Sequence, residues 1–409
     1  MGVWPGKDDF FGATMALIRL TNTYKLPMEL LAKGIIYGTE TVPLTAHEFS
    51  LIGDTARERD LMYESVLWYN QSAALLKMES TVDKTKTARA MKKLASSWFN
   101  YGMPSKALEV AEEALQYDTE NRGLIRDLEF YRNSVKRMSE NDRKKVFRRP
   151  PHPSFPYYQK YEGLCRGQIK SPREMAKLYC NYQSTSIPIY WTKVEYSNID
   201  PPVVLFHDVI SQSEIDWMIE TATEQLSRSI LGDVKNAGSM YSEARISENA
   251  WLADNYEMSI KLGKRISLIT GLDASVRHWD TYAEPFQVLN YGLGGMYEPH
   301  HDFTKLYRDS GLEDNLLFKN SGDRVATWMF YLTDVKAGGA TVFPTLKARV
   351  PAIKGAAAFW YNIKRSGVLD DRSLHAGCPL LLGTKWAANK WFRELGQAFR
   401  YGCTLDPSE

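Results

Sequence analysis

Apolar residues recur at helical spacing between about residues 46 and 138. In the stretch KKLASSWFNYGMPSKALEVAEEALQYDTEN, six residues stand in order at the offsets of a tetratricopeptide repeat, a two-helix unit of about 34 residues: Leu94, Ala95, Trp98, Gly102, Ala107 and Ala114. The preceding stretch LIGDTARERDLMYESVLWYNQSAALL is a degenerate partner unit, in which Gly53 and Leu75 take comparable positions. The pattern predicts a helical, tetratricopeptide-like module.

Aromatic residues in this module allow two interpretations. The rings either fill the interfaces between helices or line a concave surface that takes a peptide: Tyr63, Trp68, Tyr69, Trp98 and Phe99. For a single ring, packing between helices is the commoner role. For the module as a whole we favour a peptide-binding surface, because flat rings stack well on the rigid turns of proline-rich peptides.

The pattern changes at SENDRKKVFRRPPHPSFPYYQKYEG, which holds a basic cluster and the prolines Pro150, Pro151, Pro153 and Pro156. This composition is typical of a linker, and the basic run is interpreted as a solvated face. Beyond Pro201 short β-type runs dominate, among them PPVVLF, FQVLNYG, RVATWMFYL, GAAAFWYN and KWAANKWF. Many short strands of this kind indicate a sandwich or a jelly roll.

Charge and hydropathy exclude some classes of partner. Lys+Arg number 51 and Asp+Glu 49, a formal net charge of +2, so the balance does not call for nucleic acid or an anionic membrane surface. Without a run of about 18 apolar residues, no membrane span is predicted. The first five residues, MGVWP, lead into no apolar signal segment.

The four cysteines form two short-range pairs, Cys165 with Cys180 and Cys378 with Cys403. These pairs are disulfides in an oxidising compartment, or four buried thiols in the cytosol. Neither pair has the Cys-x-x-Cys spacing of a metal-binding motif.

The stretch YEPHHDF, residues 297–303, carries the first candidate metal ligands. On an extended strand successive side chains point to opposite faces, so His300 and Asp302 project together while His301 points away. One histidine and one carboxylate are two of the three ligands in the 2-His-1-carboxylate triad of non-haem Fe(II) oxygenases. A second, distant histidine must complete the triad.

The chain has seven histidines. His375, in DDRSLHAGCP, lies downstream of Asp302 beyond several predicted strands and is the best candidate for the third ligand. The four histidines outside YEPHHDF and His375 lie in the helical module, in the linker or upstream of the pair. One of them, His278, forms a second His-x-Asp pair with Asp280, but DASVRHWDTYAEP alternates poorly and is interpreted as a loop.

An Fe(II) oxygenase that uses 2-oxoglutarate also needs a buried cation for the distal carboxylate of that co-substrate, because an unpaired charge in such a pocket is costly. Lys385, ten residues after His375, or Lys390 can serve. On an extended strand the two lysines face opposite ways.

Four stretches together closely resemble the catalytic domain of the collagen prolyl 4-hydroxylase alpha subunit: NYGLGGMYEPHHDF, RVATWMFYLTDVKAGGATVFP, GAAAFWYN and HAGCPLLLGTKWAANKW. The resemblance extends over nearly all of the chain, from about Asp8 to the C-terminus. It implies that His300, Asp302 and His375 bind Fe(II) and that Lys385 binds the C5 carboxylate of 2-oxoglutarate. Tyr291 and Thr327 are carried over as pocket residues beside the co-substrate.

The same resemblance implies disulfides Cys165–Cys180 and Cys378–Cys403, an endoplasmic reticulum lumen location, L-ascorbate as reductant and protein disulfide isomerase as beta subunit. The expected fold class is α+β, with an all-α tetratricopeptide-like module followed by a double-stranded β-helix (jelly-roll) catalytic domain. We expect an N-terminal helical remnant at 1–40, the peptide-substrate-binding domain at 41–139, a linker at 140–200 and the catalytic domain at 201–409.

The chain departs from the family pattern in three respects. The printed sequence lacks the signal peptide and N-terminal dimerisation helices that the family carries, so tetramer assembly is not part of the prediction. Leu61, Met62 and Phe99 stand where the peptide groove usually has tyrosine or other polar residues. His301 replaces an apolar residue, and it is expected to point away from the metal.

The expected activity is hydroxylation of peptidyl proline in collagen-like X-Pro-Gly sequences with O2 and 2-oxoglutarate, giving 4-hydroxyproline, succinate and CO2. One alternative is a hydroxylase of another proline-rich protein. Another is a non-catalytic peptide-binding subunit. A zinc hydrolase with the same three ligands lacks a general base near YEPHHDF other than Glu298.

Overall fold

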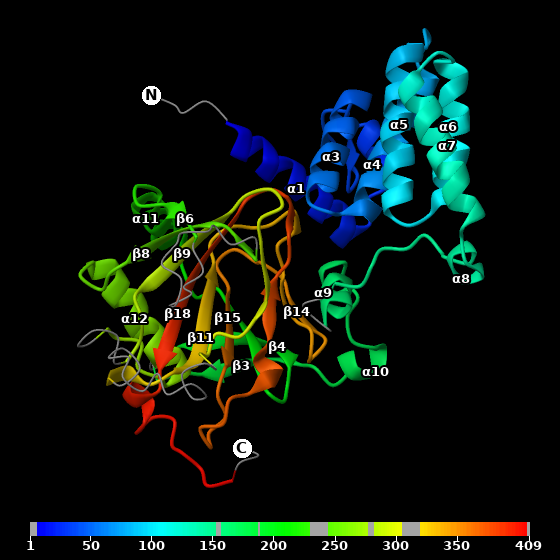
Figure 1. The fold of residues 1–409 in the computed structure, drawn as a ribbon. Coiled ribbons are helices and arrows are strands. Elements are labelled where there is room, and N and C mark those ends of the chain that lie inside the picture. The colour runs from blue at the N-terminus through cyan, green and yellow to red at the C-terminus, as the bar shows by residue number, and fades with distance from the viewer. Residues whose placement is uncertain are drawn as a thin grey trace. The chain divides into compact units, whose positions relative to one another are not determined.

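The chain folds into two compact units, a helical unit, Met1–Pro153, and a sheet unit, Ser154–Glu409 (Figure 1). The structure is a computed structural model, which describes residues 6–152, 157–186, 189–229, 244–276, 282–304 and 320–406. The mixed helix-and-sheet architecture predicted from the sequence is confirmed. Within the described residues, none of the helices combines the length and the apolar character that a bilayer crossing requires.

The helical unit is built from consecutive helices joined by short connections. Its elements are α1 (Lys7–Tyr24), α2 (Met28–Ala32), β1 (Ile35–Ile36), β2 (Thr39–Glu40), α3 (Ala46–Glu58), α4 (Met62–Met78), α5 (Lys84–Asn100), α6 (Pro104–Tyr117), α7 (Arg122–Lys136) and α8 (Glu140–Arg143). Side chains fix the helix starts, because Thr45, Asp83 and Asn121 each accept a hydrogen bond from a backbone N–H of the first turn. The helical stretch predicted between residues 46 and 138 therefore agrees with α3 to α7.

Neighbouring helices from α3 to α7 pack side by side (Figure 1). Leu94 and Ala95 on α5 and Ala107 on α6 are buried between them. Gly53 on α3 permits a close approach to α4, since a Cβ at this position would lie 2.7 Å from the ring of Tyr69. Gly53 thus allows α3 and α4 to pack closely.

The aromatic residues of this unit divide into two groups. Trp68 and Tyr69 are fully buried, so for these rings the packing interpretation is right. Tyr63, Trp98 and Tyr101 instead surround the ring of Phe147, at centroid distances of 4.7, 4.5 and 5.1 Å. They hold a segment from beyond α8 against the helices.

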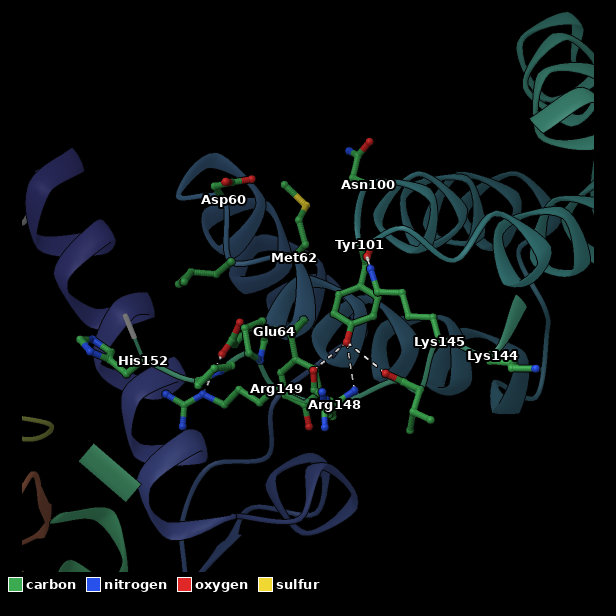
Figure 2. Close-up of a pocket in the computed structure, with 15 residues that line it drawn as sticks. Asp60, Met62, Glu64, Asn100, Tyr101, Lys144, Lys145, Arg148, Arg149 and His152 are labelled. Atoms are coloured by element: carbon green, nitrogen blue, oxygen red, sulfur yellow. Dashed lines mark hydrogen bonds and ion pairs between the residues drawn. The ribbon is translucent and has the colours of Figure 1, made fainter. Parts of the chain in front are cut away.

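That segment, residues 144–152, is here called the strap. The hydroxyl of Tyr101 donates to the carbonyl of Arg148 at 2.7 Å and accepts from the N–H of Arg148 at 3.0 Å (Figure 2). Arg149 lies 3.3 Å from the buried carboxylate of Glu64. The first part of the expected linker at 140–200 is therefore a bound part of the helical unit.

A cavity of about 770 Å³ opens beside the strap, within the helical unit (Figure 2). Leu61 and Met62, two of the residues that depart from the family pattern, line it together with Tyr101 and the strap. Phe99, the third departure, lies outside the lining of this cavity and packs on Phe130 and Tyr131.

The sheet unit contains two larger antiparallel sheets among the described residues. The first has the order β3 (Cys180–Ser184), β4 (Trp191–Asn198), β5 (Val203–His207), β15 (Ala357–Tyr361), β11 (Arg324–Tyr331), β18 (Lys385–Arg393), β9 (Phe286–Tyr291), β8 (Glu248–Leu252) and β6 (Ser227–Arg228). The second has the order β14 (Ala348–Val350), β13 (Thr341–Phe343), β16 (His375–Gly377), β10 (Met296–His300) and β7 (Arg245–Ile246). A further pair joins β12 (Ala337–Gly338) to β17 (Leu380–Leu382).

Each face of the nine-stranded sheet has its own apolar core. On one face, Phe286, Trp328 and Phe330 pack with residues of α11 (Gln212–Thr223) and α12 (Glu257–Thr270). On the other face, Tyr331 and Trp360 pack with residues of the five-stranded sheet such as those of β13 and β14. Side chains fill part of the space between the two sheets, and the rest is a cavity, described below.

The remainder of the expected linker at 140–200 belongs to the sheet unit, which corrects that boundary. It contains α9 (Tyr158–Cys165), α10 (Pro172–Met175) and the strands β3 and β4. β3 is an edge strand whose five residues are all exposed, so it has no buried apolar run that would have predicted a strand.

The expected disulfides Cys165–Cys180 and Cys378–Cys403 are wrong. Cys165 is bonded to Cys378, 213 residues away, while Cys180 and Cys403 are exposed free thiols. Helix α9 packs against β13 and β14, which brings Cys165 to the segment that follows β16. The spacing of the cysteines along the chain could not predict this pairing, because it depends on a contact between distant segments.

Candidate functional site

Three side chains converge between the two sheets. His300 ends β10, Asp302 follows it, and His375 begins the adjacent antiparallel strand β16, with His300 and His375 in register. Their ligand atoms all lie within 4.8 Å of one another. The structure thus brings together the pair from YEPHHDF and the distant histidine.

Backbone carbonyls orient both imidazoles. Nδ1 of His300 lies 2.7 Å from the carbonyl oxygen of Glu298, and Nδ1 of His375 lies 3.0 Å from that of Ser373. A carbonyl oxygen only accepts, so each Nδ1 carries a proton, and in the neutral form of each ring the lone pair lies on Nε2. Both Nε2 atoms face Asp302, at 3.8 and 3.7 Å from its carboxylate oxygens. Two lone pairs and a carboxylate are a donor set that fits a divalent cation such as Fe(II).

Electrostatics favour the protonation states that metal ligation needs. Burial, together with the nearby His375, lowers the pKa of His300 well below its ordinary value. Burial raises the pKa of Asp302, but the neighbouring His375, His300 and Arg324 outweigh it and hold that pKa at about 2. At neutral pH the site therefore presents a neutral imidazole at His300 and an ionised carboxylate at Asp302.

Thr327 on β11 supports the carboxylate. Its hydroxyl donates to Oδ2 of Asp302 at 2.6 Å and accepts from the side-chain amide of Asn362 at 2.9 Å. The sequence predicted Thr327 as a pocket residue beside the co-substrate. Thr327 is not among the residues that line the cavity described below, and its observed contact instead fixes the orientation of Asp302.

Aromatic rings hold the two histidines in place. Tyr297 stacks on His300 with a centroid distance of 3.5 Å. Trp360 lies 4.7 Å from the ring of His375 and Phe343 lies 5.7 Å from it. These contacts restrict rotation of the imidazoles without using their nitrogen atoms.

The three side chains line a cavity of about 360 Å³. Other residues that line it come from both sheets: Arg245, Trp251, Gln287, Tyr291, Thr341, Lys385, Asn389 and Trp391. Of the remaining predicted pocket residues, Tyr291 and Lys385 lie in this cavity, opposite each other on β9 and β18.

Lys385 is a buried cation in this cavity. Its ammonium lies 5.3 Å from the ring centroid of Tyr291 and 5.6 Å from that of Tyr331. Within the part of the chain that the structure describes, no ion pair joins Lys385 to a carboxylate, and burial lowers its pKa to about 7. A buried amine without a counter-ion fits an anionic ligand.

Lys390, the alternative to Lys385, serves a different purpose. Its ammonium is fully buried, lies 3.1 Å from Asp254 and sits 4.6 Å above the ring of Phe286. The charge of Lys390 is already paired, and Lys390 does not line the cavity. Lys385 is therefore the better candidate to bind the carboxylate of the co-substrate. The two lysines face opposite ways, as strand alternation predicts.

The other candidate histidines do not join the cluster. The ring of His301 packs on Phe303, and its Nε2 lies 3.3 Å from the carbonyl of Asp371. The second His-x-Asp pair, His278 with Asp280, lies outside the described residues.

Sequence reasoning missed a network of buried charges at the cavity wall. Arg324 forms two hydrogen bonds with Glu284, at 2.6 and 2.8 Å, and Arg393 lies 2.9 Å from the same carboxylate. The guanidinium of Arg324 also covers the ring of Trp391, 3.8 Å from its centroid. Arg324 is on β11, Arg393 is on β18 and Glu284 precedes β9, so the network joins segments that are distant in sequence and has no local motif.

Comparison with known proteins identifies relatives of the whole chain. A profile of the 2OG-Fe(II) oxygenase superfamily matches residues 286–393, which include all three converging side chains and Lys385. The chain is 34% identical to mouse (Mus musculus) prolyl 4-hydroxylase subunit alpha-3 over 99% of its length and 77% of the relative. It is 35% identical to rat (Rattus norvegicus) prolyl 4-hydroxylase subunit alpha-1 over 99% of its length and 78% of the relative.

Among solved structures, the chain is similar to the viral collagen prolyl hydroxylase of Paramecium Bursaria Chlorella virus-1 in its 2OG complex. The identity is 28%, the alignment covers 47% of this chain and 95% of the viral one, and the TM-score is 0.35.

Proposed function

The chain belongs to the family of prolyl 4-hydroxylase alpha subunits, and on this premise we propose that it hydroxylates peptidyl proline in collagen-like X-Pro-Gly sequences with O2 and 2-oxoglutarate. The products are 4-hydroxyproline, succinate and CO2. The observation that carries the proposal is one cavity in which the ligand atoms of two imidazoles and a carboxylate lie within 4.8 Å of one another, together with a buried ammonium that no carboxylate of the described residues pairs with.

Each residue has a separate task in this mechanism. His300, Asp302 and His375 hold Fe(II), which together with 2-oxoglutarate supplies the oxidising chemistry. Lys385 pairs with the C5 carboxylate of 2-oxoglutarate, and Tyr291 closes the pocket beside it. Thr327 keeps Asp302 oriented, and the rings around the histidines keep water from the ligands. L-ascorbate is the proposed reductant.

The closing experiment measures succinate and 4-hydroxyproline with a (Pro-Pro-Gly) repeat peptide, with and without Fe(II). The wild-type protein is expected to form both products in equal amounts and only with iron. His375→Ala is expected to form neither, because two protein ligands do not hold the metal well enough. If the wild type forms no more product than His375→Ala, the catalytic assignment is refuted and a peptide-binding subunit remains.

The helical unit is proposed to bind the substrate peptide as a tetratricopeptide-like domain, and the sheet unit to be a double-stranded β-helix. Support comes from the paired helices α3 with α4 and α5 with α6, and from two sheets that enclose the cavity. By family membership, protein disulfide isomerase is the proposed beta subunit and the endoplasmic reticulum lumen the proposed location.

A second candidate substrate is another proline-rich protein. Leu61 and Met62 give the cavity of the helical unit an apolar wall where the family has more polar residues. Turnover of (Pro-Pro-Gly) repeats, compared with proline-rich peptides that lack glycine at every third position, decides between the two. Faster turnover of the glycine-free peptides favours the second candidate.

A further inference from the structure

Trp251 on β8 is a large aromatic residue that lines the cavity containing His300, Asp302 and His375, and its side chain remains 44% exposed. Its neighbours on the strand, Ala250 and Leu252, point into the apolar core that contains α11 and α12. Alternation therefore directs Trp251 to the opposite face of the sheet, where its register partner Gln287 also lines the cavity. The ring is thus presented to the cavity and to solvent at once.

A second ring continues this wall. Trp391 on β18 lies 6.1 Å from Trp251, measured between ring centroids, and the guanidinium of Arg324 covers it at 3.8 Å. Trp391 is buried, and its indole N–H has no hydrogen-bond acceptor among the residues that the structure describes. Because Trp391 lines the cavity, this N–H is available to a bound molecule or to water. The substrate peptide is therefore expected to pass this end of the cavity.

The size of the cavity separates the reacting proline from its neighbours. About 360 Å³ is near the lower limit for a small-molecule site and suits 2-oxoglutarate and one pyrrolidine ring. The residues that flank the target proline must then lie at the mouth, where a half-exposed aromatic ring is available. Proline residues in polyproline II conformation offer a rigid, apolar ring to such a surface.

We propose that Trp251 determines specificity by stacking on the pyrrolidine ring of a proline that flanks the target proline. This proposal rests on the proposed function and assigns part of its substrate preference to one side chain. Trp251 need not touch the reacting atoms for this role. Its effect is on which peptide is held, so its loss changes the preference between peptides rather than the chemical step.

The experiment compares kcat/KM for a Pro-Pro-Gly repeat and an Ala-Pro-Gly repeat of equal length, using the full-length chain. Trp251→Leu is expected to lower the preference for Pro-Pro-Gly by about three- to tenfold, the range of an aromatic stacking contact. Trp251→Phe keeps a ring and is expected to retain most of the preference. Any preference of the helical unit for one peptide is the same in all variants. It therefore cancels when the ratio of the two kcat/KM values is compared between a variant and the wild type.

Trp191 provides a matched control. It is 59% exposed on β4, at the other end of the same sheet order, and it does not line the cavity. Trp191→Leu is expected to leave the ratio unchanged. An unchanged ratio in Trp251→Leu overturns the proposal, whereas a wild-type protein that hydroxylates neither peptide overturns the proposed function instead.

A measurement on the wild type alone guards against misfolding of the variant. A peptide in which N-methylalanine replaces the flanking proline keeps the tertiary amide but lacks the ring. The wild type is expected to process it about three- to tenfold less efficiently than the proline peptide. Equal efficiency with both peptides shows that no ring is recognised and overturns the proposal.

Discussion

The hydroxyl of Thr327 donates a 2.6 Å hydrogen bond to Oδ2 of Asp302, and this bond joins the nine-stranded sheet to the carboxylate of the metal site. We expect Thr327→Val to weaken Fe(II) binding by about tenfold, because loss of a partner that orients a ligating carboxylate typically costs 10- to 100-fold in affinity. The measurement is calorimetric titration with Mn²⁺ or Fe(II) under anaerobic conditions.

Thr327→Ser is the control for this prediction, because it keeps the hydroxyl and removes only a methyl group. It is expected to bind metal nearly as well as the wild type. If Thr327→Val and Thr327→Ser have the same metal affinity, the hydrogen bond has no part in holding the metal.

The ammonium of Lys385 makes binding of 2-oxoglutarate depend on pH. Burial lowers the pKa of Lys385 to about 7, so the amine of the unliganded protein loses its proton as pH rises through that value. Because the carboxylate binds the charged form, affinity is highest below pH 7 and falls above it, by up to tenfold per pH unit. Binding above pH 7 is therefore coupled to proton uptake, which calorimetry in buffers of different ionisation enthalpy measures.

Lys385→Met is expected to abolish this pH dependence and to weaken 2-oxoglutarate binding by at least 100-fold. It is also expected to stabilise the unliganded protein, since a buried, uncompensated charge is removed. Between pH 7 and about 10.5 the folded state binds fewer protons at Lys385 than the unfolded state, so the stability of the wild type rises with pH over this range. The buried ammonium of Lys385 therefore lowers the stability of the wild type most below pH 7. Thermal unfolding at pH 6 is predicted to show the largest difference in melting temperature between Lys385→Met and the wild type. A less stable Lys385→Met protein at pH 6 contradicts the argument.

Much of the candidate site could be predicted from the sequence because it depends on local rules. Strand alternation groups His300 with Asp302 and separates Lys385 from Lys390, and both relations hold in the structure. His375 could be found because the chain has few histidines. Convergence of the three residues required the sheet order, which places β10 beside β16.

Two of the failures concern contacts between distant segments. Cys165 pairs with Cys378 because α9 packs against β13 and β14, and spacing favoured the nearer partner Cys180. The strap was interpreted as a solvated linker because its basic residues mask Phe147, whose burial depends on rings from α4 and α5. Trp251 gave no signal at all, since one exposed aromatic residue in a strand is common.

The Cys165–Cys378 bond is expected to stabilise the sheet unit by about 3 kcal/mol, because it closes a long loop and restricts the unfolded chain. Cys165→Ser and Cys378→Ser should therefore each lower the melting temperature, and the double variant should lower it no further. Cys180→Ser and Cys403→Ser remove exposed thiols and should leave it unchanged. Differential scanning calorimetry measures the temperatures, and peptide mapping without reduction identifies the bonded pair. Recovery of a Cys165–Cys180 peptide contradicts the observed pairing.

Phe147 is the residue that attaches the strap to the helical unit. Its ring contacts Tyr63, Trp98 and Tyr101, so Phe147→Ala is expected to destabilise this unit by about 2 kcal/mol, less than for a fully buried phenylalanine. Val146→Ala, at a neighbouring position that is 69% exposed, is the control and should change stability by less than about 0.5 kcal/mol. Hydrogen exchange distinguishes detachment of the strap from general loosening of the helical unit. The backbone N–H of Arg148 donates to the hydroxyl of Tyr101, so detachment of the strap exposes this N–H before the amides within α5 and α6. If that N–H is as well protected in Phe147→Ala as in the wild type, the strap is held by its polar contacts, and the aromatic cluster is not its anchor.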